Sequence, residues 1–207
     1  MHLKRQRAAT KLPIPRKGTA FIARALSHTE NSVPVVIAVR DMLKLARTAG
    51  EVKKMIKEKL LKINGLPVKD YRESINLFNL FEADKNYILT LLPTGKFIFE
   101  ESKDNLRLCK VINKKLLKNN TVQINLHDGS NLISKDKISV GDSIYLDLQG
   151  KIKKHVKLEE GRWAIIIFGK YTGLKGKINS TEGKMVWILI EGNEKLTKLN
   201  DNQIIVK

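Results

Sequence analysis

Cysteine is nearly absent from this chain of 207 residues, and Cys109 is its one example. A single thiol can build neither a disulfide framework nor a zinc site made of thiolates, and such usage is typical of a reducing cytosol. Cys109 lies between Leu108 and the Lys110-Val111 pair. This context indicates a buried structural thiol rather than a nucleophile.

Long hydrophobic runs are also missing. No apolar segment approaches the roughly 18 residues that a spanning helix requires, and the N-terminus lacks the apolar core of a signal peptide. Attraction to an anionic membrane surface is the only membrane role that these absences leave open. The length allows one or two compact domains, or several very small ones.

The first 29 residues contain no Asp or Glu, and Glu30 is the first acid of the chain. The same segment holds seven basic residues, which are Lys4, Arg5, Arg7, Lys11, Arg16, Lys17 and Arg24. Such a segment repels itself and has too few apolar groups to fold alone. We therefore predict an arm, disordered in isolation, that orders on a dense polyanion such as nucleic acid. The Pro13-Ile14-Pro15 sequence forbids a helix and favours an extended path for this arm.

Positive charge is present in excess and is unevenly distributed. The net charge is +18, and residues 1–72 account for two thirds of it, with 17 basic and 5 acidic side chains. A charge of this size says nothing about the fold, but it restricts the partners to RNA, DNA or an anionic membrane. We expect the electrostatic contact surface in the first third of the chain.

Residue sets for catalysis or metal binding are missing as well. His127-Asp128 precedes a glycine, which indicates a polar turn between strands rather than an acid–base pair. His2, His28 and His155 lie in basic, loop-like contexts without the spacing of metal ligands. No glycine-rich loop followed by Lys-Ser or Lys-Thr is present. We predict that the protein is not an enzyme and uses neither a cofactor nor a metal.

Two helices and a hairpin are predicted after the arm. The segment from Pro34 to Ala46 carries apolar residues at helical spacing, with proline at the first helical position. Thr48-Ala49-Gly50-Glu51 is a capping box, which predicts the start of a second helix. The apolar stripe of that helix consists of Val52, Met55, Ile56 and Leu60. The segment from Leu61 to Leu66 has Asn-Gly at its centre, which is typical of a hairpin turn.

Basic residues occur along the two predicted helices and the hairpin. Helical spacing places Arg40, Lys44 and Arg47 on one face of the first helix, and Lys53 and Lys57 share a face of the second with Lys54 beside them. Lys59, Lys62 and Lys69 extend the positive surface to the hairpin. A solvated lysine-rich face is the alternative interpretation. The net charge of +6 over residues 40–72 and the adjoining arm favour contact with phosphate.

From Tyr87 onward the pattern changes to short strands separated by turn residues. Strands are predicted over 87–91, 97–99, 108–112, 121–126, 144–148, 163–168, 175–179 and 185–190, which indicates small barrels or curved sheets. The fold class expected for the chain is therefore α+β. A lysine-rich cluster in this region is equally consistent with a phosphate patch and a solvated strand, and it consists of Lys151, Lys153, Lys154, His155 and Lys157.

The run from Arg47 to Ile56, followed by Lys62-Ile63-Asn64-Gly65-Leu66-Pro67-Val68, resembles the alpha-L-type RNA-binding domain. That domain occurs in a small-subunit ribosomal protein, in pseudouridine synthases and in tyrosyl-tRNA synthetases. The resemblance implies that two helices and a hairpin present a concave basic face to structured RNA. No catalytic Asp motif of a pseudouridine synthase is recognisable here.

The segment from Glu160 to Ile178 is similar to a KOW motif, in which a strand, a glycine-rich turn and a return strand follow each other. Gly169, Gly173 and Gly176 permit positive φ and a close backbone approach. The turn carries side chains that can meet phosphate or stack on a base, namely Lys170, Tyr171, Lys175 and Lys177. An ordinary barrel hairpin that needs glycine for its bend is the alternative.

The order of these modules resembles one family over essentially the whole chain, the small-subunit ribosomal protein four of the e-type, found in archaea and eukaryotes. The series begins with His2-Leu3-Lys4-Arg5 and Ile14-Pro15-Arg16-Lys17, and it continues past the alpha-L-type segment with Leu108-Cys109-Lys110-Val111 and the stretch 123–129. The short N-terminus and the lack of a C-terminal extension look archaeal. The chain departs from the family pattern at Ala8-Ala9, Leu12, 25–29 and 78–80, which affects the local path of the arm and any contact of Asn79.

The resemblance implies four parts, which are a basic arm over 1–32, an alpha-L-type RNA-binding domain over 33–86, a central β domain over 87–158 and a KOW SH3-like barrel over 159–207. It also implies a structural role in the small ribosomal subunit in the cytoplasm, with small-subunit rRNA and other ribosomal proteins as partners and no homo-oligomer. A KOW-containing transcription or translation regulator that binds RNA and a protein is the alternative. The predicted RNA-binding residues are Lys4, Arg5, Arg7, Lys11, Arg16, Lys17, Arg40, Lys44, Arg47, Lys53, Lys54, Lys57, Lys62, Lys170, Tyr171 and Lys175.

Overall fold

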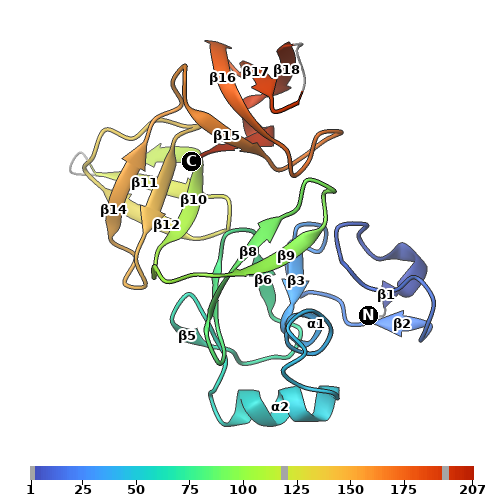
Figure 1. Ribbon diagram of the computed structural model, residues 1–207. Coiled ribbons are helices and arrows are strands. Elements are labelled where there is room, and N and C mark those ends of the chain that lie inside the picture. Colours follow the sequence, from blue (N-terminus) through green and yellow to red (C-terminus); the bar gives the residue numbers. More distant parts are fainter. Residues whose placement is uncertain (1–2, 118–120, 193–195) are drawn as a thin grey trace. The chain divides into compact units, whose positions relative to one another are not determined.

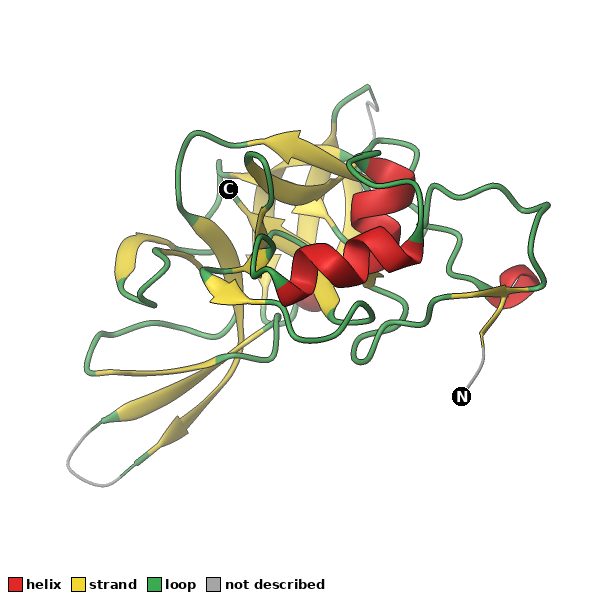
Figure 2. Cartoon of the chain, turned by 90° about the horizontal axis from the view of Figure 1, so that it is seen from below, coloured by secondary structure: helices red, strands yellow, loops and turns green. Residues whose placement is uncertain are grey.

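A computed structural model describes residues 3–117, 121–192 and 196–207. The chain divides into two compact units, one of residues 1–90 and 96–105 and the other of residues 91–95 and 106–207. The regular secondary structure of the described chain is mostly strand, with two short α-helices in the first unit (Figure 1). Figure 2 shows the helical segments in red within a chain of strands and loops. The α+β expectation therefore holds in the coarse sense of a mostly β protein with few helices.

The first unit is built on a five-stranded sheet in the order β5-β4-β7-β8-β9. Its strands are β4 (Lys62–Ile63), β5 (Leu66–Pro67), β7 (Leu80–Glu82), β8 (Asn86–Leu91) and β9 (Phe97–Glu101). A second, two-stranded sheet pairs β3 (Ser32–Pro34) with β6 (Ser74–Asn76). Phe81 and Phe97 are fully buried, and the rings of Phe81 and Phe99 lie 5.9 Å apart. These aromatic residues supply much of the apolar area that holds the sheet together.

The N-terminal arm is a closed loop, so the prediction of an extended, self-repelling path is wrong. Strand β1 (Leu3–Lys4) pairs antiparallel with β2 (Phe21–Ile22), and a short 3-10 turn, η1 (Arg5–Arg7), follows β1. The Arg5 guanidinium donates to the backbone oxygens of Pro15 and Thr19 at 2.7 and 2.8 Å. Leu12 is buried, and the backbone N–H of Phe97 donates to the Lys11 oxygen at 2.8 Å. The arm closes because its polar backbone and one cation find partners within the protein.

The first predicted helix is shorter than its apolar pattern indicated. Helix α1 (Val35–Ile37) continues into one π-helical turn, η2 (Ala38–Met42), in which the N–H of Leu43 donates to the Ala38 oxygen. The residues from Val35 to Val39 are all buried, so this segment is a core element rather than an amphipathic surface helix. Lys44 then takes a left-handed φ of 58°, which ends the helix.

The second predicted helix and the hairpin form as expected. Helix α2 spans Ala49–Lys57, and the Thr48 hydroxyl accepts from the Glu51 N–H at 3.2 Å. The Glu51 carboxylate accepts from the N–H of Arg47 at 2.7 Å, and this bond holds the pKa of Glu51 below its usual value. Asn64 and Gly65 have φ values of 51° and 81°, as a two-residue hairpin turn between β4 and β5 requires. Leu60 lies beyond the helix and is exposed, so it does not belong to the apolar stripe.

The second unit contains two five-stranded sheets, each with its own apolar core. The first has the order β12-β11-β10-β13-β14, with β10 (Arg107–Leu116), β11 (Val122–Leu126), β12 (Asn131–Ser134), β13 (Ser143–Leu146) and β14 (Ile152–Val156). The second has the order β18-β17-β16-β15-β19, with β15 (Trp163–Ile166), β16 (Lys175–Glu182), β17 (Met185–Ile190), β18 (Leu196–Asn200) and β19 (Ile204–Val206). A short 3-10 turn, η4 (Asp201–Gln203), joins the last two strands.

The predicted strands all appear within a few residues of their expected ends. Four strands of the second unit were not predicted, namely β12, β14, β18 and β19. The core of the first sheet includes Ile124 and Ile144, and that of the second includes Ile166 and Ile188. Length does not separate the two groups, because the unpredicted β14 and β18 have five residues whereas the predicted β13 and β15 have four.

One lysine links the two sheets of the second unit. The Lys110 side chain leaves β10 and donates to the backbone oxygens of Asp201 and Ile204, the second at 2.8 Å. The Ser143 hydroxyl accepts from the N–H of Val206 at 3.1 Å, which adds a second polar link. Burial disfavours the charged ammonium and lowers the pKa of Lys110 to about 8.

The lowered pKa of Lys110 predicts a stability that rises with pH. Between about pH 8 and 10.5 the unfolded chain holds a proton that the native chain has lost, so deprotonation favours the native state. From about pH 7.5 to 9.5 the free energy of unfolding should rise by roughly 2 kcal/mol relative to a Lys110→Met variant. Urea titrations of both proteins at a series of pH values measure this difference. Parallel pH profiles would contradict a lowered pKa.

Candidate nucleic-acid interface

Helix α2 presents the densest group of exposed cations on a single element of the first unit. Lys53, Lys54 and Lys57 are exposed, whereas Val52 on the opposite side is fully buried. The spacing of four residues places Lys53 and Lys57 on the same face, as predicted. Because the buried side anchors the helix, the three ammonium groups are directed to solvent without a cost to the core. We call these three residues the α2 basic face.

The surroundings of the α2 basic face leave most of its charge available. Lys54 has a weak ion pair with Glu58 at 4.0 Å, in which both side chains are exposed. The Lys53 ammonium lies over the Tyr71 ring, 4.8 Å from its centre. The Arg72 guanidinium lies 5.5 Å from the same ring and forms an ion pair with Asp70 at 3.1 Å. Tyr71 therefore orients a cation of this face, a role that sequence analysis missed, although the ring lies between Lys69 and Arg72 in a basic stretch.

The other predicted cations of this region are more dispersed. Lys62 on β4 forms an ion pair with Glu82 at 3.6 Å, so part of its charge is balanced. Arg40 forms a two-bond pair with its neighbour Asp41, with a shortest distance of 2.8 Å. Lys44 and Arg47 are exposed but follow the helix end. The expected common helical face of Arg40, Lys44 and Arg47 is therefore wrong, because the helix ends at Met42, before the second of these residues.

Six of the seven basic residues of the arm divide into two groups, and the seventh, Arg24, is half-buried. Arg5 is used to close the loop, and the Lys11 ammonium donates to the Asn31 side chain at 2.7 Å. Burial is the main cause that lowers the pKa of Lys11, and the nearby Glu30 opposes it. The second group is exposed and directed to solvent, and it consists of Lys4, Arg7, Arg16 and Lys17. Only this second group is free to meet a polyanion without opening the arm.

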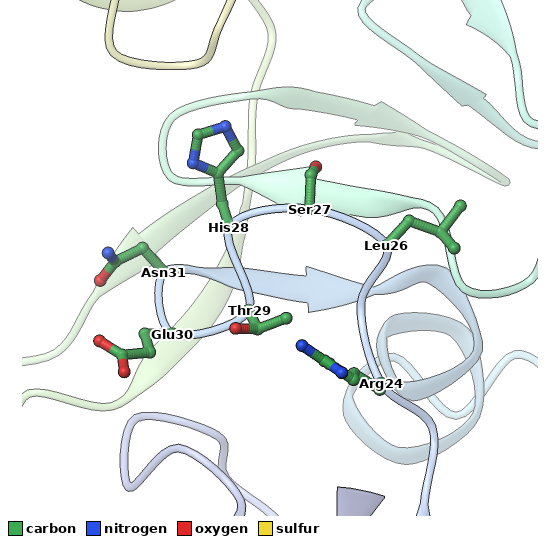
Figure 3. Close-up of a pocket in the computed structure, with 7 residues that line it drawn as sticks. All are labelled: Arg24, Leu26, Ser27, His28, Thr29, Glu30 and Asn31. Carbon is green, nitrogen blue, oxygen red and sulfur yellow. The ribbon is translucent and has the colours of Figure 1, made fainter. Parts of the chain in front are cut away.

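An open hollow of about 420 Å³ lies at the end of the arm, where the backbone turns back on itself (Figure 3). Its lining consists of Arg24, Leu26, Ser27, His28, Thr29, Glu30 and Asn31. The Ser27 N–H donates to the Ser74 hydroxyl at 2.9 Å, which fixes the loop to β6. The hollow combines a cation with a carboxylate and is formed by one loop, so it provides no concentrated charge of one sign.

The glycine-rich turn of the second unit has the predicted backbone, with one correction. Gly169 and Gly173 have φ values of 93° and 91°. Gly176 does not have a positive φ. Glycine is required at this position for space, because a Cβ there would lie 2.4 Å from Cγ2 of Ile188. Lys170 is exposed and its ammonium lies 5.7 Å from the centre of the Tyr171 ring. Tyr171 packs against the core and is only half-buried, and Lys175 is exposed at the start of β16.

The residues considered for acid–base or thiol chemistry have structural partners. Asp128 forms a buried ion pair with Arg107 at 2.7 Å, and the His127 ring accepts from the N–H of Lys110 at 3.1 Å. Burial raises the pKa of the Cys109 thiol, which keeps the group protonated. Asp142 caps the N–H groups of Ser139 and Leu158 and also contacts His155.

Among the described residues, no group of three or more His, Cys, Asp or Glu side chains is placed to hold a metal ion. The described helices also include none that is both long and apolar enough to cross a membrane. The chain thus combines small β modules, separate cores and exposed cations on several elements. These features define a class of basic, mostly β proteins whose charge is available to a polyanion.

Comparison with known proteins identifies the family. The model of the Ribosomal family S4e matches residues 83–152. The chain is 34% identical to the small ribosomal subunit protein eS4 of Methanococcus maripaludis, over 90% of this chain and 83% of the relative. It is 31% identical to the small ribosomal subunit protein eS4 of Archaeoglobus fulgidus, over 100% of this chain and 93% of the relative.

A solved structure shares the fold. The crystal structure of the 30S ribosomal protein S4e from Thermoplasma acidophilum superposes with a TM-score of 0.72 at 23% identity, and the match covers 85% of this chain and 94% of that chain. The chain belongs to the eS4 family of ribosomal proteins, as the order of its modules predicted.

Proposed function

We propose that this protein is a structural constituent of the small ribosomal subunit in the cytoplasm, where it binds rRNA and neighbouring ribosomal proteins and has no catalytic role. Membership of the eS4 family is the single observation that carries this proposal. The net charge of +18 and the exposed cations of the first unit support a contact with phosphate. The alternative of a KOW-containing regulator has no support, since the relatives carry the name of a small-subunit protein.

The α2 basic face and the hairpin after it form the core of the proposed rRNA contact. This assignment corresponds to an alpha-L-type domain over residues 33–86, and it is supported by helix α2 and the Asn64-Gly65 turn. Lys53, Lys54 and Lys57 would neutralise phosphates and release counterions, while the buried side of the helix fixes their position. Lys62, Lys44 and Arg47 extend the contact along the same part of the chain.

The arm and the glycine-rich turn are the other two proposed contacts. In the arm, the exposed side chains of Lys4, Arg7, Arg16 and Lys17 meet rRNA, whereas Arg5 is used to keep the loop closed. The turn would act as the RNA-facing part of a KOW barrel over residues 159–207, through Lys170 and Lys175. The separate core of the last five-stranded sheet supports this boundary, and the core around Ile124 supports a central domain over 87–158.

Because the proposed contacts are mainly to phosphate, rRNA affinity should fall steeply with salt. If about seven or more phosphates are met, the slope of log K against log salt should be on the order of −5 or steeper. Filter binding of the full chain to small-subunit rRNA at a series of KCl concentrations, from about 50 to about 300 mM, measures this slope. A slope near zero would rule out the phosphate mechanism.

The cellular part of the proposal is tested by sedimentation. A tagged full-length chain should migrate with small subunits on a sucrose gradient in moderate salt, and high salt should move it toward the top. The combined variant Lys4→Glu, Arg7→Glu, Arg16→Glu and Lys17→Glu measures the contribution of the arm, because these side chains are exposed and the buried Leu12 is kept. Undiminished incorporation of this variant would remove the arm from the proposed contact and leave the α2 basic face as the main one.

A further inference from the structure

The outer side of the sheet formed by β10, β11 and β12 carries an ordered set of side chains that the proposed phosphate contacts do not use. These strands are adjacent in the sheet (Figure 1). Asn113 is opposite Asn125, which is opposite Asn131 on the next strand. Two pairs further along, and so on the same side of the sheet, Lys115 is opposite Gln123, which is opposite Ile133. We call these six residues the amide face.

The amide face lies on the solvent side of the sheet. Ile124 and Leu126 alternate with Gln123 and Asn125 along β11 and are buried in the core, so the amide side chains are directed the other way. A bulge at Ile112 keeps this alternation in phase across β10 and β11. Asn113, Lys115, Asn131 and Ile133 are all exposed, and Ile133 reaches an exposed fraction of 71%.

The composition of this face is not explained by sheet stability. Asparagine is depleted in strands because its side chain does not pack well on a pleated surface and competes for backbone hydrogen bonds. Here three asparagines occupy one row across three strands. The side-chain hydrogen bond within the face joins Gln123 Nε2 to Asn125 Oδ1 at 3.0 Å, along one strand rather than between strands. The described residues of the row therefore do not form a cross-strand amide ladder.

Much of the hydrogen-bonding capacity of the face is left available to a ligand. Asn113 Oδ1 accepts from the N–H of Lys114 at 2.8 Å, and this bond does not use the amino group of the exposed Asn113 side chain. The Asn131 side chain forms no hydrogen bond with any residue in 3–117, 121–192 or 196–207. A carboxamide offers a donor and an acceptor side by side, which matches the paired donor and acceptor groups on the edge of a nucleic-acid base.

We propose that the amide face binds unpaired bases of RNA and recognises them by their edges. This inference rests on the proposed function, since it assumes an rRNA partner. Adjacent strands are about 4.8 Å apart, so the row of three asparagines extends over roughly 10 Å, which is enough for one or two splayed nucleotides. Lys115 supplies a cation for the connecting phosphate, Ile133 supplies an apolar surface for a base plane, and none of the six residues is acidic.

RNA is favoured over a protein partner by the chemistry of the face. Protein interfaces concentrate aromatic and apolar side chains at their centre, whereas Ile133 is the one large apolar residue among the six. Single-stranded loops and bulges are the RNA elements whose bases are free to be hydrogen-bonded in this way. The amide face thus adds base recognition to the phosphate contacts of the first unit.

The test is a full-length variant with Asn113→Thr, Asn125→Thr and Asn131→Thr. Threonine favours strands, so the fold should be kept, and circular dichroism and a thermal melt verify this. Filter binding to small-subunit rRNA should show an affinity at least about tenfold lower with an unchanged salt slope, because bases rather than phosphates lose their contacts. Dimethyl sulfate probing should show that the wild-type chain protects specific unpaired adenines or cytosines and that the variant does not.

A matched control is Asn179→Thr, which changes an exposed asparagine of strand β16 in the other sheet and should leave affinity and protection unchanged. Equal affinity and equal base protection for wild type and triple variant would overturn the inference. Unchanged RNA binding with reduced incorporation into small subunits would overturn it too, in favour of a protein partner. If the wild-type chain itself did not bind rRNA, the proposed function would fail first, and that result is distinguishable from the other two.

Discussion

Substituting Gly173 with alanine should destabilise the second unit by at least about 4 kcal/mol, the range reached only by severe core or backbone defects. A Cβ at this position would lie 1.9 Å from the backbone oxygen of Leu92, and Gly173 also has a φ of 91°. The obstacle is backbone, so no side-chain rotation can relieve it. Leu92 lies in the turn between β8 and β9, which is itself held by the bond from the Gly95 N–H to the Leu92 oxygen at 2.8 Å.

A matched variant separates the steric effect from the conformational one. Gly161 has a φ of 82°, and a Cβ added there would meet no heavy atom of the described residues within 4 Å, so Gly161→Ala carries the backbone penalty alone. That penalty is roughly 1–2 kcal/mol. Urea unfolding of both variants and the wild type measures the difference between them, which should be about 2 kcal/mol or more. Equal destabilisation would show that the approach of Leu92 to Gly173 is not a feature of the folded protein.

Reversing the charge of the α2 basic face should weaken rRNA binding by at least about a hundredfold near physiological salt. The variant combines Lys53→Glu, Lys54→Glu and Lys57→Glu, all exposed on a helix that is anchored from the opposite side by Val52. Loss of three phosphate contacts should also make the log–log salt slope shallower by about 3. Since the core is not touched, the melting temperature should change little.

The control for this variant carries the same change in net charge elsewhere. Lys151→Glu, Lys153→Glu and Lys154→Glu alter exposed residues of the second unit, at or beside β14. If the α2 basic face is a specific contact, the control should lose much less affinity than the α2 variant. Equal losses would mean that the α2 basic face is not a specific contact, because either the overall charge determines binding or the β14 cluster meets phosphate as well. The same pair of variants tests whether the lysine cluster around β14 is a solvated strand.

Local sequence signals predicted local structure well. The Thr48 cap, the Asn64-Gly65 turn and the strands with clear alternation depend on residues within a few positions of each other, so their physical causes are visible in the sequence. The first helix shows where this reasoning fails. Residues Val35 to Val39 are apolar at every position because the segment is buried on all sides, and such a pattern does not contain the information that one turn is π-helical.

The arm shows the same limit at longer range. Its charge and prolines indicated an extended segment, yet Arg5 finds the oxygens of Pro15 and Thr19, and Leu12 finds a place in the core. These partners are ten or more positions from Arg5, and no local rule selects them. A cation that was counted as available for RNA is consequently used within the protein, which changes the composition of the candidate interface.

The order of residues along the chain was sufficient to predict the excess of positive charge and the α2 basic face. It was also sufficient to recognise the lack of catalytic and metal-binding patterns and the series of modules that is typical of the family. The closed arm, the burial of Lys110 and the row formed by Asn113, Asn125 and Asn131 required the folded protein. The physical reason is that charge and helical or strand periodicity are properties of neighbouring residues. Strand register and burial arise from contacts between distant residues, and they fix which cations stay exposed and which amides share a face.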